Sequence, residues 1–180
     1  MNRIVRSALL SAACALALNV APALAQHPQT RNGFWFSGGL GYGSRGCDGC
    51  DGREGGLSGG LAFGGTLSDK VLLAVGTTGW SKSEFGGSLT VGTLDARIRF
   101  YPMVTSGFFL TGGLGLGSVY ASIDGFGSET EWGLGGVLGL GYDFRVGRNL
   151  SLTPFWNGYA VQSGDVDANV GQLGLSVTVH

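Results

Sequence analysis

The segment from Leu89 to Tyr101, LTVGTLDARIRFY, alternates between two kinds of side chain and constrains the fold more than any other part of the chain. Successive side chains of a β-strand point to opposite faces, so a period of two predicts a strand. One face contains Thr90, Gly92, Leu94, Ala96, Ile98 and Phe100, and the opposite face contains Thr93, Asp95, Arg97 and Arg99. In a soluble sheet the apolar face would be buried, whereas in a barrel within a lipid bilayer it would face outward.

The first 25 residues have the three parts of a secretory signal peptide. A basic start with Arg3 and Arg6 precedes the apolar stretch 8–20 and the small-x-small sequence at 23–25. Cleavage at the end of this sequence would leave residues 26–180 as the mature chain, which we expect to form a single domain. Export favours the membrane barrel, in which the apolar face points outward, over the soluble sheet.

Composition favours an all-β fold. Glycine accounts for 36 of the 180 residues, interleaved with Leu, Val and Phe, and glycine at every second or third position is costly in a helix. No mature segment approaches the roughly 18 continuous apolar residues of a transmembrane helix. Without the signal peptide the chain has nine basic and 12 acidic residues and no basic stripe, which argues against a nucleic-acid partner.

Alternation of this kind recurs in eight segments of the mature chain. They span residues 33–43, 56–66, 71–80, 88–101, 107–121, 131–145, 150–161 and 168–179. The connections alternate between longer, charged ones and tight turns of four or five residues such as LSDK and VGRN. The pattern predicts an eight-stranded antiparallel up-and-down transmembrane β-barrel with long extracellular loops and short periplasmic turns.

Aromatic residues fall mostly near the ends of these segments, where the girdles of a membrane barrel meet the bilayer interface. The predicted interface aromatics are Phe34, Trp80, Phe100, Phe108, Trp132 and Phe144. The alternative is a soluble β-sandwich or a lipocalin-like periplasmic binder with the apolar face inside. Against it, the opposite face is mostly Gly, Ser and Thr and is poor in the Lys and Glu that usually cover soluble sheets.

The export signal, eight Gly-rich amphipathic segments and alternating loop lengths together resemble the small outer-membrane β-barrel family, with its porin-like OmpA-type and OmpX-type barrel domains. The resemblance covers nearly the whole mature chain and implies an outer-membrane location in a Gram-negative-type cell envelope. One position departs from the family, whose members often end in an aromatic residue that contributes to the assembly signal. This chain ends GLSVTVH, with His180 last.

Charged residues on the inner face are the first candidate for a site. Asp95, Arg97 and Arg99 lie on one segment, and Asp143 and Arg145 lie on another. Buried charges need partners, and interlocking Arg–carboxylate pairs would supply them inside a narrow barrel. We expect a polar plug that stiffens the barrel and closes its lumen; the alternative is an ion path or gate.

The first long connection contains Cys47 and Cys50, which export exposes to an oxidising compartment. A local disulfide is the simplest expectation. A redox CxxC would need a following helix, and two cysteines with nearby aspartates make only a weak metal signal, so we expect no metal and no cofactor. A lipoprotein start at Cys14 is a weaker alternative to signal cleavage, because Ser11 stands where a lipobox usually has leucine.

Catalytic chemistry has little support in the sequence. The mature chain has two histidines, His27 and His180, and neither lies within a strand segment beside a serine and a carboxylate. The match of residues 41–46 to G-x-G-x-x-G is not followed by a helix and does not indicate nucleotide binding. We therefore expect no enzyme.

The expected function is a non-enzymatic integral barrel with a structural or surface-interaction role. A narrow channel or transporter for small or apolar solutes is the alternative within the same fold. The expected partners are outer-membrane lipid and lipopolysaccharide, together with the barrel-assembly machinery and periplasmic chaperones during biogenesis. The four longer connections, taken with Glu131 directly after one of them, contain nine acidic and three basic residues, which would suit divalent-cation bridges to lipopolysaccharide phosphates.

Overall fold

The computed structural model describes residues 31–47, 52–84, 86–123, 125, 127–163 and 166–180. The strands are β1 (Phe34–Cys47), β2 (Glu54–Ser68), β3 (Val71–Glu84), β4 (Gly87–Phe100), β5 (Phe108–Ile123), β6 (Gly127–Tyr142), β7 (Phe144–Arg145), β8 (Leu150–Ser163) and β9 (Val166–Val179). In this part of the chain, no helix is long and apolar enough to cross a membrane.

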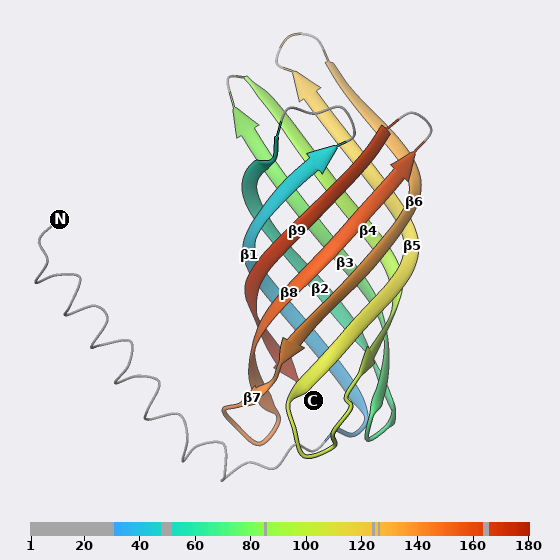
Figure 1. The fold of residues 1–180 in the computed structure, drawn as a ribbon, viewed down its shortest axis with the longest axis vertical. Coiled ribbons are helices and arrows are strands. Elements are labelled where there is room, and N and C mark those ends of the chain that lie inside the picture. Colours follow the sequence, from blue (N-terminus) through green and yellow to red (C-terminus); the bar gives the residue numbers. More distant parts are fainter. Residues whose placement is uncertain (1–30, 48–51, 85, 124, 126, 164–165) are drawn as a thin grey trace, which may run out of the picture.

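The strands form one antiparallel sheet that closes on itself (Figure 1). Consecutive strands pair from β1 to β6 and from β7 to β9, β1 pairs with β9, and β6 pairs with β8. The two-residue β7 continues β6 beyond a break at Asp143 and also pairs with β8. The wall of the barrel therefore consists of eight strands, and the predicted eight-stranded antiparallel barrel is confirmed.

The two ends of the barrel differ. We call the end with the connections 69–70, 101–107 and 146–149 the turn end, and the opposite end, with the four remaining connections, the hairpin end (Figure 1). Arg31 and His180 both lie at the turn end, where Arg31 donates to the carbonyl of Ser106 and the His180 amide donates to Asn149.

Several strands continue further towards the hairpin end than the sequence predicted. The β3–β4 ladder runs to the pair Glu84 and Gly87, and the β5–β6 ladder runs to Ile123 and Gly127. Charged residues that suggested long loops, such as Lys82, Glu84 and Glu129, are instead part of paired strands, where their side chains can still reach solvent. Much of the predicted extracellular loop length is thus projecting hairpin.

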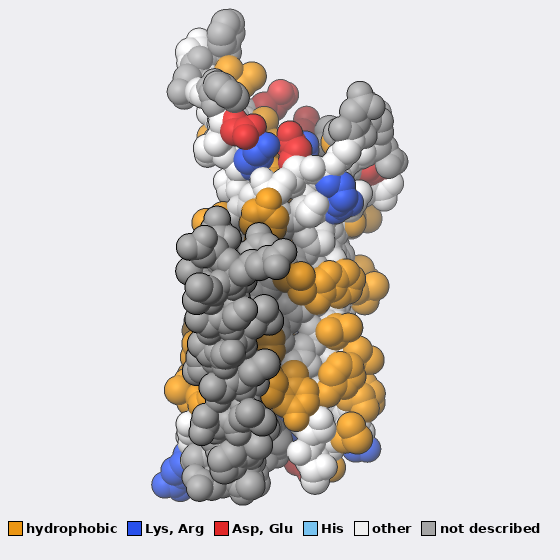
Figure 2. All heavy atoms as spheres, turned by 60° about the vertical axis from the view of Figure 1, so that its left-hand side comes forward, with side chains coloured by type: hydrophobic (Ala, Val, Ile, Leu, Met, Phe, Trp, Pro, Cys, Tyr) orange, Lys and Arg blue, Asp and Glu red, His pale blue; other side chains and the backbone are white. Residues whose placement is uncertain are grey.

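The apolar face of β4 points outward and its charged face points into the barrel, which is the reverse of a soluble sheet. The outward-facing Leu94, Ile98 and Phe100 are 41–53% exposed, whereas Asp95 and Arg97 are 2% and 8% exposed. The same exposed apolar face recurs around the barrel, and Figure 2 shows orange hydrophobic side chains on the visible wall, with most of the blue and red charged side chains at the hairpin end. An apolar outer band with charges inside is the arrangement of a transmembrane barrel.

Candidate functional site in the barrel lumen

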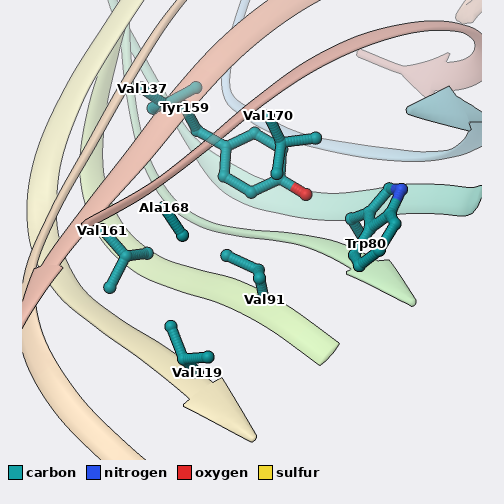
Figure 3. Close-up of a cluster of buried hydrophobic side chains, with 8 residues drawn as sticks. All are labelled: Trp80, Val91, Val119, Val137, Tyr159, Val161, Ala168 and Val170. Carbon is teal, nitrogen blue, oxygen red and sulfur yellow. The ribbon is translucent and has the colours of Figure 1, made fainter. Parts of the chain in front are cut away.

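The inward-facing side chains fill the lumen in layers. Towards the hairpin end lies an apolar cluster (Figure 3) of Trp80, Val91, Val119, Val137, Tyr159, Val161, Ala168 and Val170. Towards the turn end lies a second cluster of Trp35, Ala62, Leu72, Tyr101 and Phe109. The buried polar and charged side chains lie between these clusters and at the turn end.

Trp80 is inside the barrel and only 1% exposed, so its prediction as a membrane-interface aromatic is wrong. Its indole Nε1 donates to the carbonyl of Gly43 at 3.1 Å. A Cβ added at Gly43 or Gly56 would lie 2.6–2.7 Å from the indole ring, so these glycines provide the space that the ring occupies. Strand β3 has apolar residues on both faces, and alternation alone therefore did not show which face Trp80 occupies.

The other predicted interface aromatics do not share this position. Phe34, Trp132 and Phe100 are 90%, 65% and 41% exposed on the outer surface, and Phe108 and Phe144 are partly buried. Their contact with a bilayer interface stays a prediction.

Asp95 and Arg97 form a buried ion pair within β4. Arg97 donates to both carboxylate oxygens of Asp95, each at 2.8 Å, and also to Thr78 Oγ1 at 2.8 Å. Glycines flank the pair, because a Cβ at Gly76 would lie 2.8 Å from the Arg97 guanidinium and one at Gly113 would lie 2.6 Å from Asp95 Oδ1. A bidentate, desolvated pair of this kind is geometrically specific.

Asp143 organises a separate network at the turn end. It is fully buried and accepts hydrogen bonds from Tyr101 Oη at 2.7 Å and from Thr153 Oγ1 at 2.6 Å. His180 Nε2 lies 3.7 Å from the same carboxylate. The backbone amide of Asp143 donates to Gly107 at the break between β6 and β7, which anchors the residue where the ladder is interrupted.

Arg99 contacts aromatic rings. Its guanidinium lies 4.5 Å from the centroid of the Trp35 ring and 4.2 Å from that of Phe109. Arg31, nearby at the turn end, lies 3.5 Å above the Tyr101 ring. Cation–π contacts of this kind are strongest when they are desolvated, as they are here.

The five predicted plug residues are thus all buried in the lumen, with Asp95 and Arg97 in one group and Asp143 and Arg145 in another. The structure also brings residues into these groups that the sequence analysis did not select, namely Arg31, Trp35, Thr78, Tyr101, Phe109, Thr153 and His180. The positions of Thr78 and Thr153 in the period-two alternation of their strands could have indicated that they face inward. Their partners lie on other strands and could not be read from one segment.

Protonation at the turn end depends on burial. Burial lowers the pKa of His180 below its ordinary value, and the nearby Asp143 carboxylate opposes this effect without cancelling it, while Arg145 and Arg99 add to the lowering. Burial also raises the pKa of Tyr101 to about 12, so this phenol stays protonated and remains a donor.

We expect the barrel to lose stability as the pH falls below about 6.5, the ordinary pKa of histidine. The folded state prefers the neutral imidazole of His180, so protons bind more readily to the unfolded chain and acid favours unfolding. Urea midpoints measured from about pH 8 to pH 5.5 test this. A His180→Gln variant should show a smaller pH dependence, and an unchanged slope would contradict the assignment to this residue.

Cys47 lies at the hairpin end of β1 and is disulfide-bonded. Cys50 lies outside the described residues, as do Asp48 and Asp51, so the Cys47–Cys50 pairing stays a prediction. Within the described ranges no group of three or more His, Cys, Asp or Glu side chains could hold a metal ion.

Salt bridges occupy the rim at the hairpin end. Glu54 lies 3.2 Å from Arg45 and 3.8 Å from Lys82, and Lys82 also pairs with Glu84 at 2.9 Å. The exposed Glu129 and Glu131 lie on the part of β6 that projects beyond its pairing with β8, which starts at Leu134. The rim is therefore charged, and its exposed carboxylates are in reach of ligands from solution.

A closed antiparallel barrel with an apolar outer band and with charged side chains buried in its lumen defines an integral membrane β-barrel. Residues 10–180 match the model of the outer membrane protein beta-barrel domain, and the chain belongs to this family. It is therefore an outer-membrane protein, as the sequence predicted, and a soluble lipocalin-like binder is the wrong class.

Solved structures share the fold at low sequence identity. Neisserial surface protein A (NspA) is 21% identical with a TM-score of 0.62, covering 83% of this chain and 98% of the other. Ail, the attachment invasion locus protein of Yersinia pestis, is 16% identical with a TM-score of 0.60, covering 83% and 99%. Ail has also been solved with the heparin analogue sucrose octasulfate, at 17% identity, a TM-score of 0.59 and the same coverage. No curated protein sequence gives a significant match.

Proposed function

We propose that this protein is a non-enzymatic outer-membrane barrel that works through its outer surface and not by conducting solutes. The filled lumen supports this proposal. The cluster around Trp80 lies in the hairpin half, and the buried Asp95–Arg97 pair, the Asp143 network and the turn-end apolar cluster lie in the other half. Aqueous channels belong to barrels of about 16–18 strands, whereas about eight strands leave an interior that side chains can fill.

The rim supports a surface role. Exposed carboxylates on projecting β6 would bind divalent cations that also contact lipopolysaccharide phosphates, while the apolar band contacts lipid. Ail in complex with a sulfated sugar is a related barrel with a polyanionic ligand, which makes carbohydrate-rich surfaces a reasonable class of partner. During biogenesis, periplasmic chaperones and the barrel-assembly machinery would be the further partners.

We expect the purified barrel to give no stepwise conductance in planar lipid bilayers, because the packed side chains leave no continuous aqueous path. A porin of about 16–18 strands in the same bilayers provides the positive control. Conductance steps that change in an Arg97→Gln or Arg99→Gln variant would instead support the narrow-channel alternative. Cells lacking the protein should show weaker envelope integrity or attachment, and a defect only in solute uptake would contradict the surface role.

We also propose that the mature protein starts at Gln26. Intact-mass measurement of the barrel from outer membranes should give the mass of residues 26–180, with two hydrogens fewer if Cys47 and Cys50 form a disulfide. A lipid-modified start at Cys14 would give a much heavier species. Either that result or retention of residues 1–25 would refute the proposed cleavage.

A further inference from the structure

The lumen contains more buried positive than negative side chains. Among the described residues, the buried charged side chains are Arg31, Arg97, Arg99 and Arg145 on one side and Asp95 and Asp143 on the other. Four arginines against two aspartates leave an excess of two positive charges. Moving an ion from water into a low-dielectric interior is strongly unfavourable unless a counter-charge compensates it.

Arg99 is attracted electrostatically by Asp143, but among the described residues no carboxylate forms a salt bridge with it. Arg97 has both oxygens of the Asp95 carboxylate, whereas Arg99 contacts the faces of Trp35 and Phe109. Its Nε and Nη1 are buried and have no hydrogen-bond partner among the described residues, and the residue as a whole is only 7% exposed. Buried N–H donors without an acceptor destabilise the folded state, so an acceptor beside them would stabilise the barrel.

A cavity of about 40 Å³ lies beside this guanidinium. Arg97 and Arg99 both line it, as do the hydroxyl and amide side chains of Thr78, Asn157 and Gln172. None of the described carboxylates lines it. A space of this size holds a small ion with one or two waters, since one water needs about 10–15 Å³ on the same measure.

We propose that this cavity binds a small monovalent inorganic anion of the size of chloride or bromide. The two guanidiniums supply the charge, the free N–H groups of Arg99 donate to the anion, and Thr78 Oγ1 has its proton available because its oxygen accepts from Arg97. The anion neutralises part of the excess charge and occupies the space beside Ala62 and Phe109 of the turn-end cluster. This inference concerns the lumen and is independent of the proposed surface role.

Crystals of the barrel grown in sodium bromide test the site directly. We expect an anomalous bromide peak in the cavity, in contact with the Arg99 guanidinium. A cavity that contains only water would overturn the proposal.

Stability in solution shows whether binding also occurs outside the crystal. At constant ionic strength, the urea midpoint of the wild-type barrel should be higher in chloride or bromide than in gluconate, which is too large for the cavity. Arg99→Met should remove this anion dependence, and Arg148→Met, which changes an exposed arginine, should keep it. If Arg99→Met does not fold, the wild-type urea midpoints in chloride or bromide and in gluconate still test the proposal. A bromide peak without any anion dependence would mean binding at crystal concentration only and would refute the proposal.

Discussion

Asp143→Asn is expected to lower the free energy of unfolding by about 3–5 kcal/mol, the range for breaking a buried charge network by removing one partner. The side chain is fully buried and accepts short hydrogen bonds from Tyr101 and Thr153. The amide keeps the volume but removes the negative charge. The lumen would then hold four buried arginines against one aspartate.

Urea unfolding of the barrel in lipid vesicles, followed by the mobility shift between folded and heat-unfolded protein on unboiled gels, measures the loss. Asp167→Asn is the matched control, since Asp167 is exposed on β9 and surface changes usually stay within about 0.5 kcal/mol. Equal midpoints for the two variants would show that the Asp143 network does not stabilise the barrel.

Trp80→Ala should destabilise the barrel by a similar amount, about 3–5 kcal/mol, because it creates a cavity in the apolar cluster of the lumen. The substitution also removes the hydrogen bond from the indole to Gly43 and the contact with Arg45, whose guanidinium lies 5.6 Å from the ring centroid. Gly43 and Gly56 leave space for this ring and cannot fill the void themselves.

Trp132→Ala makes the same chemical change on the outer surface, where the side chain is 65% exposed. Its effect on the urea midpoint should be a small fraction of that of Trp80→Ala. A larger loss for Trp132→Ala would mean that the interface aromatics, and not the packed lumen, dominate stability. Conductance of the Trp80→Ala barrel is a second readout, since this ring is the largest side chain of the hairpin-end cluster.

Alternation in the sequence was sufficient to predict the barrel. The period of two in β4 assigned Asp95, Arg97 and Arg99 to one face, and the predicted export signal indicated that this face would be inside. Counting the alternating segments also yielded the right number of strands. The strand ends were less well predicted, because polar residues such as Lys82 and Glu84 are equally compatible with a loop and with a strand whose faces both meet water.

The lumen was only partly predictable. All five predicted charges are buried, but the contacts of Arg99 with Trp35 and Phe109 join residues from three strands. Trp80 was placed on the wrong face because β3 has apolar side chains on both faces: Leu72 is buried inside and Leu73 is 40% exposed outside. A tryptophan near a strand end is compatible with either location.

The sequence by itself determined the strand period and, on β4, which face is apolar and which is charged, because these depend on local order along the chain. The tertiary structure decided which inward residues meet, since closure between β6 and β8 and between β1 and β9 sets the stagger of all the strands. That stagger places Thr153 and Tyr101 against Asp143 and leaves Arg99 beside a cavity without a carboxylate. Register is a property of the closed sheet, and no single strand contains it.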